Sequence, residues 1–150
     1  MTLLRLPAQT KLHWRGESNR RRRRIVRDIA QADIAHLAVV RTGRDGERAE
    51  RSRRKCLERL LHELGRRGIQ TVVLESRGRA DDMRDVSMVD ALRAQRRVSA
   101  RVRVAQAVGR NEPLLWVADA VCGALSSALI GADEFRTLLG DRIAVFDISP

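Results

Sequence analysis

Segments with helical periodicity alternate with short β-branched segments along this chain, and this order constrains the fold more than any other feature. We expect helices at residues 17–33, 47–66, 86–95 and 114–129, with a short one in "ADEFRTLLG". We expect strands at residues 34–40, 69–76, 101–108 and 142–148. Such alternation is typical of α/β folds, in which a largely parallel sheet is flanked by helices. The length of 150 residues suits a single domain over 1–150.

Local signals indicate where several of these elements begin. Ser18 or Asn19 is suited to cap the first helix, and Pro113 is suited to the first turn of the last long helix. The second helix is the clearest, because four leucines repeat at helical spacing: Leu57, Leu60, Leu61 and Leu64. The segment "RGRADDMRD" before residue 86 is expected to be a charged loop.

The core must be built from aliphatic side chains. The chain has two tryptophans, two phenylalanines and no tyrosine. Cys56 and Cys122 fall at apolar helix positions, so we expect small buried side chains rather than a disulfide or a zinc site. The segment "MTLLRLPAQTK" is too short an apolar run for a signal peptide, and no segment reaches the roughly 18 apolar residues of a membrane span. A soluble cytoplasmic protein is expected.

Positive charge is the most unusual property of the composition. The formal net charge is +11, and of the 30 basic residues all but Lys11 and Lys55 are arginines. Arginine binds phosphate through a planar fork of donors, so the balance favours a nucleic-acid partner. The candidate phosphate-binding residues lie in "NRRRRR" and "RSRRK": Arg20, Arg21, Arg22, Arg23, Arg24, Arg53 and Arg54. The alternative is that these runs are merely solvated helix faces.

A single acid, Asp119, interrupts the apolar helix "EPLLWVADAVCGALSSAL". A helix that is apolar on every side is expected to be buried against a sheet and a second helix. A buried carboxylate costs several kcal/mol unless a cation compensates it. Two answers are therefore open for Asp119: a paired arginine, or a divalent metal ion bound through oxygen.

A second acid, Glu75, closes the strand "TVVLE". In open α/β sheets, ligand sites gather outside the carboxyl ends of the strands. Glu75 and Asp119 together could therefore bind Mg²⁺ at one edge of the sheet, with Asp82 as a supplementary oxygen ligand. The alternatives are that Glu75 faces solvent and that Asp82 and its acidic neighbours are loop or helix-cap residues.

Three segments, "KLHWRGES", "VVLESR" and "EPLLWVADAVCGAL", occur in an order that resembles an uncharacterised bacterial family. That family is catalogued as a domain of unknown function, number thirty-eight hundred in its series, and is similar to ribonuclease H in fold. The resemblance implies a three-layer ribonuclease-H-like fold with metal-dependent nuclease chemistry. It further implies that Glu75 and Asp119 are the catalytic, metal-binding acids and that His13 lies close to the site.

The chain departs from the family pattern at one point. Family members open with a strand that carries an Asp-Glu-Ser motif, whereas here "MTLLRLPAQT" precedes the "KLHW" segment. In ribonuclease-H-like sites that aspartate bridges the metals, so two-metal hydrolysis by this chain is in doubt. Three explanations fit: a misassigned start, a decayed and inactive copy, or completion by a partner strand or by self-association through the exposed sheet edge.

Three functions are therefore compatible with the sequence. The first is a Mg²⁺-dependent nuclease, a hydrolase of phosphodiester bonds that uses Glu75 and Asp119. The second is a non-catalytic, basic nucleic-acid-binding module with salt-sensitive affinity. The third is an interaction protein in which Asp119 is a structural acid paired with arginine.

Overall fold

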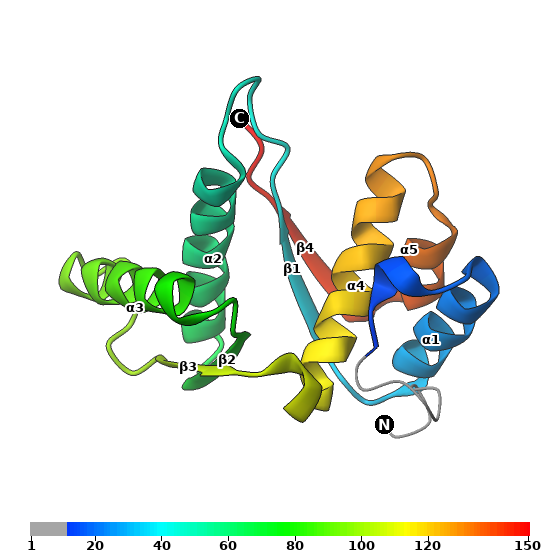
Figure 1. The fold of residues 1–150 in the computed structure, drawn as a ribbon, viewed down its shortest axis with the longest axis horizontal. Helices are drawn as coiled ribbons and strands as arrows, with labels where there is room; N and C mark the ends of the chain where they lie inside the picture. Colours follow the sequence, from blue (N-terminus) through cyan, green and yellow to red (C-terminus); the bar gives the residue numbers. More distant parts are fainter. Residues whose placement is uncertain (1–11) are drawn as a thin grey trace. The chain divides into compact units, whose positions relative to one another are not determined.

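The computed structural model describes residues 12–150, in which helices and strands alternate (Figure 1). The helices are α1 (Asn19–Gln31), α2 (Ala49–Arg66), α3 (Arg79–Ala94), α4 (Pro113–Leu129) and α5 (Glu134–Leu139). Single 3-10 turns are η2 (Trp14–Gly16), η3 (Gly109–Asn111) and η4 (Gly140–Arg142). The strands are β1 (His36–Val40), β2 (Thr71–Glu75), β3 (Arg103–Ala107) and β4 (Ile143–Asp147). The α/β class predicted from the sequence is confirmed.

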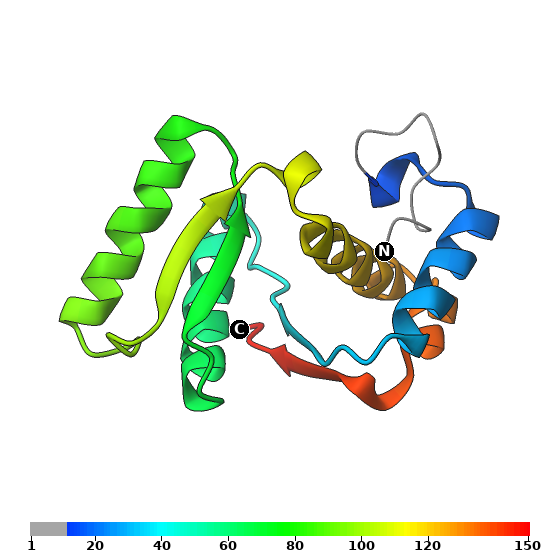
Figure 2. The ribbon, with the colours of Figure 1, turned by 90° about the horizontal axis from the view of Figure 1, so that it is seen from below.

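The four strands pair in two small sheets, β1 with β4 and β2 with β3, rather than in one. The chain leaves β2, passes through α3 and returns to β3 in the parallel direction (Figure 2). The register aligns Thr71 with Arg103 and Glu75 with Ala107. Strands of only five residues carry little information about their partners, which is why the sequence did not predict this pairing. The ribonuclease-H-like arrangement stays a prediction.

The chain divides into two compact units. The α4 unit comprises the described residues up to His36 together with Val108–Ala144, and the α2 unit comprises Leu37–Ala107 together with Val145–Pro150. Each unit has its own hydrophobic core. The prediction of a single domain stays a prediction.

Helices α1, α4 and α5 form the core of the α4 unit, which also contains η2 (Figure 1). The Ser18 side chain accepts a hydrogen bond from the Arg21 backbone N–H, which confirms Ser18 as the N-cap of α1. Helix α1 buries three apolar side chains, Ile25, Val26 and Ile29. Trp14 meets Phe135 of α5 edge to face, with ring centroids 5.0 Å apart.

Helix α4 begins at Pro113 as predicted, but it is buried on one face only. Trp116, Ala120 and Ala124 are on the buried face, whereas Leu114 is 55% and Leu129 is 64% exposed. The expectation that Cys122 is buried is wrong, because it lies on the exposed face, while Cys56 is half-buried. None of the helices formed by residues 12–150 combines the length and the apolar character that crossing a membrane requires.

The core of the α2 unit lies between α2, α3 and one face of the β2–β3 sheet. Seven buried side chains form it: Leu57, Leu61, Met88, Val89, Leu92, Val98 and Val102. Val72, Leu74 and Val104 pack against this cluster from the sheet. The intervening residues of the two strands are exposed: Thr71, Val73, Arg103 and Ala105. The side chains of β2 and β3 thus alternate between the core and solvent, as expected of a sheet that is covered on one face.

Helix α3 begins at Arg79, seven residues earlier than predicted. Of the expected charged loop, only Arg77 and Gly78 precede the helix, and the rest forms its first turns. Asp81 and Asp82 occupy the first turn, where the positive end of the helix dipole favours carboxylates. Gly78 at the N-cap has a φ of 100°, a conformation that glycine adopts without strain.

Candidate functional site

Asp119 binds a backbone amide on a distant segment. Its Oδ2 accepts a hydrogen bond of 3.1 Å from the backbone N–H of Trp14, at the start of η2. The Trp14 ring lies over Gly123, one turn further along α4, so closely that an added Cβ would overlap it. The "KLHW" and "ADAVCGA" segments of the sequence are thereby joined. Asp119 positions η2 on α4.

The expected arginine partner of Asp119 is not found among residues 12–150, where Asp119 forms no ion pair. Arg22 binds Trp14, the residue whose N–H Asp119 accepts from: the Arg22 Nε donates to the Trp14 carbonyl oxygen at 3.0 Å. The Arg22 guanidinium also lies 5.0 Å from the centroid of the Trp14 ring, within the range of a cation–π interaction. A backbone N–H can satisfy a half-buried carboxylate oxygen without a cation, which the sequence pattern could not indicate.

Replacing Asp119 with alanine is expected to lower the free energy of unfolding by about 1–3 kcal/mol, because the Trp14 N–H loses its partner. Asp119→Asn keeps an oxygen acceptor at the same place and is expected to cost less than about 1 kcal/mol. Urea unfolding followed by tryptophan fluorescence measures both changes. Equal losses in the two variants would contradict this role of the Asp119 oxygen.

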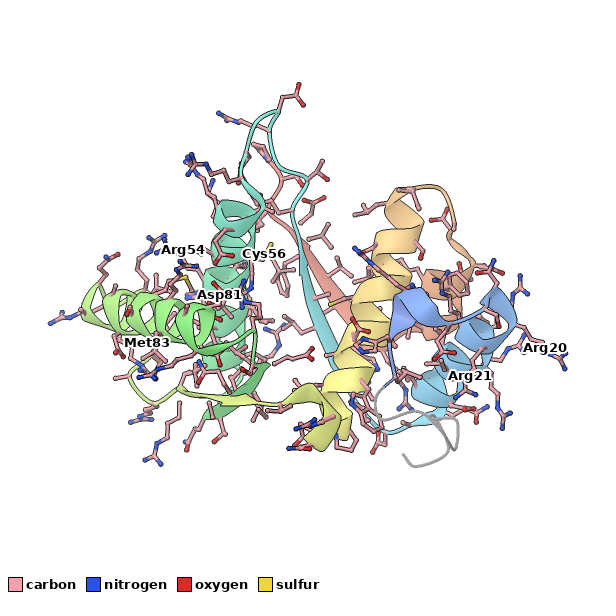
Figure 3. The ribbon with its side chains drawn as sticks, in the orientation of Figure 1. Arg20, Arg21, Arg54, Cys56, Asp81 and Met83 are labelled. Atoms are coloured by element: carbon pink, nitrogen blue, oxygen red, sulfur yellow. The ribbon has the colours of Figure 1, made fainter. Side chains whose placement is uncertain are left out.

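The arginine run of α1 divides into engaged and exposed members. Arg21 pairs with Glu17 at 3.2 Å, Arg23 pairs with Glu134 at 2.8 Å, and Arg22 binds Trp14 as described. Arg20, Arg24 and Arg27 are exposed and form no ion pair among residues 12–150. These three arginines are spaced by four and three residues, so they lie along one stripe of α1. Arg20 extends outward from the helix (Figure 3). His13 is exposed just before η2.

Glu75 and Asp82 lie where β2 ends and α3 begins. Glu75 is half-buried as the last residue of β2. The Asp82 Oδ2 accepts from the Ser76 hydroxyl at 2.5 Å, and its Oδ1 accepts from the Arg77 backbone N–H at 2.9 Å. These two hydrogen bonds hold the pKa of Asp82 below its usual value, and the bond from Ser76 has the larger effect. Asp82 thus stabilises the connection between β2 and α3 with both carboxylate oxygens.

The two acids that the sequence assigns to a magnesium site lie in different units. Glu75 belongs to the α2 unit and Asp119 to the α4 unit, so each has its own surroundings. Among the described residues, no group of three histidine, cysteine or acidic side chains could hold a metal ion. One Asp119 oxygen and both Asp82 oxygens accept hydrogen bonds from the protein. Magnesium binding stays a prediction.

The two neighbouring arginines Arg53 and Arg54 have different surroundings. Arg53 donates to both oxygens of Asp85, at 2.6 and 2.8 Å, and so joins α2 to α3. Asp85 is 2% exposed and also accepts from Arg77 at 3.4 Å. Arg54 is exposed and extends from α2 (Figure 3). Arg54 is therefore available to an external anion, whereas Arg53 belongs to the internal structure of the unit.

Arg54 is one of four exposed arginines on the first turns of α2 and the loop before it. These four, Arg44, Arg48, Arg51 and Arg54, are called the α2 basic face, and none forms an ion pair among residues 12–150. Arg48, Arg51 and Arg54 line a hollow of about 750 Å³, and Arg44 and Arg51 line a second of about 440 Å³. The candidate run "RSRRK" contains Arg51 and Arg54, whereas Arg44 and Arg48 were not predicted, although Arg48 lies three residues before Arg51 on the predicted helix.

The glutamates that border the α2 basic face already have cationic partners. Glu47 pairs with Arg41 at 2.7 Å, Glu50 pairs with Arg77 at 3.1 Å, and Glu58 pairs with Arg97. Hydrogen bonding to Arg41 is the main reason that the pKa of Glu47 is lowered to about 2. Because these acids are neutralised from other directions, the positive charge of the four arginines remains uncompensated locally.

Comparisons with family models, with curated proteins and with solved structures find no match to this chain. The fold and the site therefore define a class only: an arginine-rich α/β protein with an exposed basic helix face. Membership of the family that the sequence resembles stays a prediction.

Proposed function

We propose that this chain is a non-catalytic nucleic-acid-binding module that holds phosphates on the α2 basic face. The observation that carries the proposal is that four exposed arginines gather there without an acidic partner among residues 12–150. A guanidinium with no internal partner keeps all its donors for phosphate oxygens, and such contacts provide most of the affinity in non-specific binding. The Arg20, Arg24 and Arg27 stripe of α1 is a second, smaller surface of the same kind.

The test measures the binding of fluorescently labelled oligonucleotides by anisotropy, with single strands of 20 nucleotides and duplexes of 20 base pairs. Replacing all four arginines of the α2 basic face with glutamine is expected to weaken binding about a hundredfold or more at 100 mM salt, because four phosphate contacts are lost. Circular dichroism checks that the variant keeps its helices.

The matched control changes four exposed arginines elsewhere in the α2 unit that also form no ion pair among residues 12–150: Arg66, Arg79, Arg101 and Arg103. Their replacement with glutamine removes the same charge and is expected to change binding less than about fivefold. Equal losses in the two variants would show that the net charge of the chain, rather than the α2 basic face, binds the oligonucleotide.

A metal-dependent nuclease is the second candidate, and the position of Glu75 favours it. Glu75 lies at the carboxyl end of a strand in a parallel pair, the edge at which α/β proteins bind ligands. Calorimetric titration of Mg²⁺ and Mn²⁺ into the protein tests this candidate, alongside Glu75→Gln and Asp119→Asn. Saturable binding that both substitutions abolish would favour the nuclease, and binding that neither changes would exclude these two acids as ligands.

A further inference from the structure

The surroundings of the aromatic side chains restrict the kind of nucleic acid that this chain can bind well. Proteins that bind single strands stack the unpaired bases on exposed aromatic rings. Trp14, Trp116 and Phe135 are at most 5% exposed. The fourth ring, Phe146, is covered by two guanidiniums, with Arg59 at 4.7 Å and Arg67 at 5.5 Å from its centroid. These four are all the tryptophan and phenylalanine residues, and the chain has no tyrosine, so no uncovered ring of these three types is available to an unpaired base.

The α2 basic face has the dimensions of a short stretch of duplex backbone. Arg48, Arg51 and Arg54 follow one side of α2 over six residues, a rise of about 9 Å. Phosphates of one strand recur about every 3.4 Å along a duplex axis, so this distance corresponds to about three phosphates. Arg44, in the loop before α2, lines a hollow together with Arg51 and can supply one more contact.

From these two observations we propose that the ligand of the α2 basic face is the phosphate backbone of a double-stranded nucleic acid, contacted without regard to base sequence. This inference rests on the proposed function and adds to it the class of ligand. A duplex presents two strands of phosphate and hides its bases, so it offers the highest charge density at no stacking cost. A single strand offers fewer charges per length, and its bases find no uncovered tryptophan, phenylalanine or tyrosine ring to stack on.

The experiment compares a 20-base-pair duplex with each of its separate strands between 50 and 200 mM KCl, again by anisotropy. With about four phosphate contacts, the affinity for the duplex is expected to fall about 150-fold over this range. We expect each single strand to bind at least about tenfold more weakly than the duplex at 100 mM salt, and duplexes of different base composition to bind within about twofold. The variant without the α2 basic face is expected to lose most of the salt dependence, and the matched control variant to keep it.

The outcomes separate the inference from the function on which it rests. Absence of binding to both the duplex and the single strands would overturn the proposed function itself. Single strands that bind as tightly as the duplex, or a tenfold preference among duplexes, would overturn the duplex inference and leave the function standing. Equally tight binding of polyglutamate would overturn it too, because the face would then recognise any polyanion.

Discussion

Replacing Gly123 with alanine is expected to lower the free energy of unfolding of the α4 unit by about 2–4 kcal/mol. The added Cβ would overlap Trp14 Cγ, so the ring must leave a site in which it is 5% exposed. Loss of a buried tryptophan costs about 3–5 kcal/mol, whereas alanine gains about 1 kcal/mol over glycine within a helix. The loss of the ring contacts therefore outweighs the gain in helix propensity.

The chain offers a direct measurement of this effect. Both tryptophans lie in the α4 unit, so tryptophan fluorescence during urea unfolding reports on that unit. Gly16→Ala is the control, because a Cβ at Gly16 would meet no atom within 4 Å. In a Trp14→Ala background, Gly123→Ala is expected to be neutral or to stabilise by up to about 1 kcal/mol. A large loss in that background would contradict the clash with Trp14.

Replacing Asp85 with alanine is expected to lower the free energy of unfolding of the α2 unit by about 2–4 kcal/mol. Asp85 is 2% exposed and receives two hydrogen bonds from Arg53 and one from Arg77. Removing Asp85 takes away the two short hydrogen bonds of the partly desolvated Arg53, whose other acidic neighbour, Glu50, lies 3.9 Å away. Arg77 keeps its pair with Glu50. Both arginines are 30% exposed, so water compensates part of the loss.

Circular dichroism at 222 nm follows this variant, because the α2 unit contains no tryptophan. Asp90→Ala is the matched control on the same helix: the Asp90 side chain is 64% exposed, and its pair with Arg93 lies at the surface. Such exposed pairs contribute about 0.5 kcal/mol. An effect of Asp85→Ala no larger than that of Asp90→Ala would show that the Arg53–Asp85 contact does not hold α2 to α3.

Local signals predicted most of the secondary structure. The Ser18 cap of α1 and Pro113 at the start of α4 act within one helix turn, and the leucine spacing of α2 extends over two. All three predictions are confirmed. The start of α3 was missed because acidic residues are common both in loops and in the first turn of a helix. The pairing of the strands was missed because it depends on contacts between distant segments.

The candidate site was less predictable for the same reason. Asp119 was recognised as unusual from its apolar neighbours, but its partner is a backbone amide 105 residues away, and any residue other than proline carries such a group. The arginine runs were recognised as candidates for phosphate binding. Which of these arginines lack an acidic partner is decided by where the acids lie after folding. Arg53 and Arg54 are adjacent in sequence, yet only Arg53 meets a buried aspartate.

The separation of Trp14 from Asp119 also has a consequence for synthesis on the ribosome. At about 5–20 residues per second, Trp14 is made about 5–20 s before Asp119, and α1 has no α4 to pack against during that interval. The core of the α2 unit, from Leu57 to Val102, is complete earlier. Charged residues that flank an apolar segment suppress aggregation of nascent chains. Five arginines stand directly ahead of the apolar stripe of α1, so we expect them to limit aggregation of this segment until the rest of the α4 unit is made.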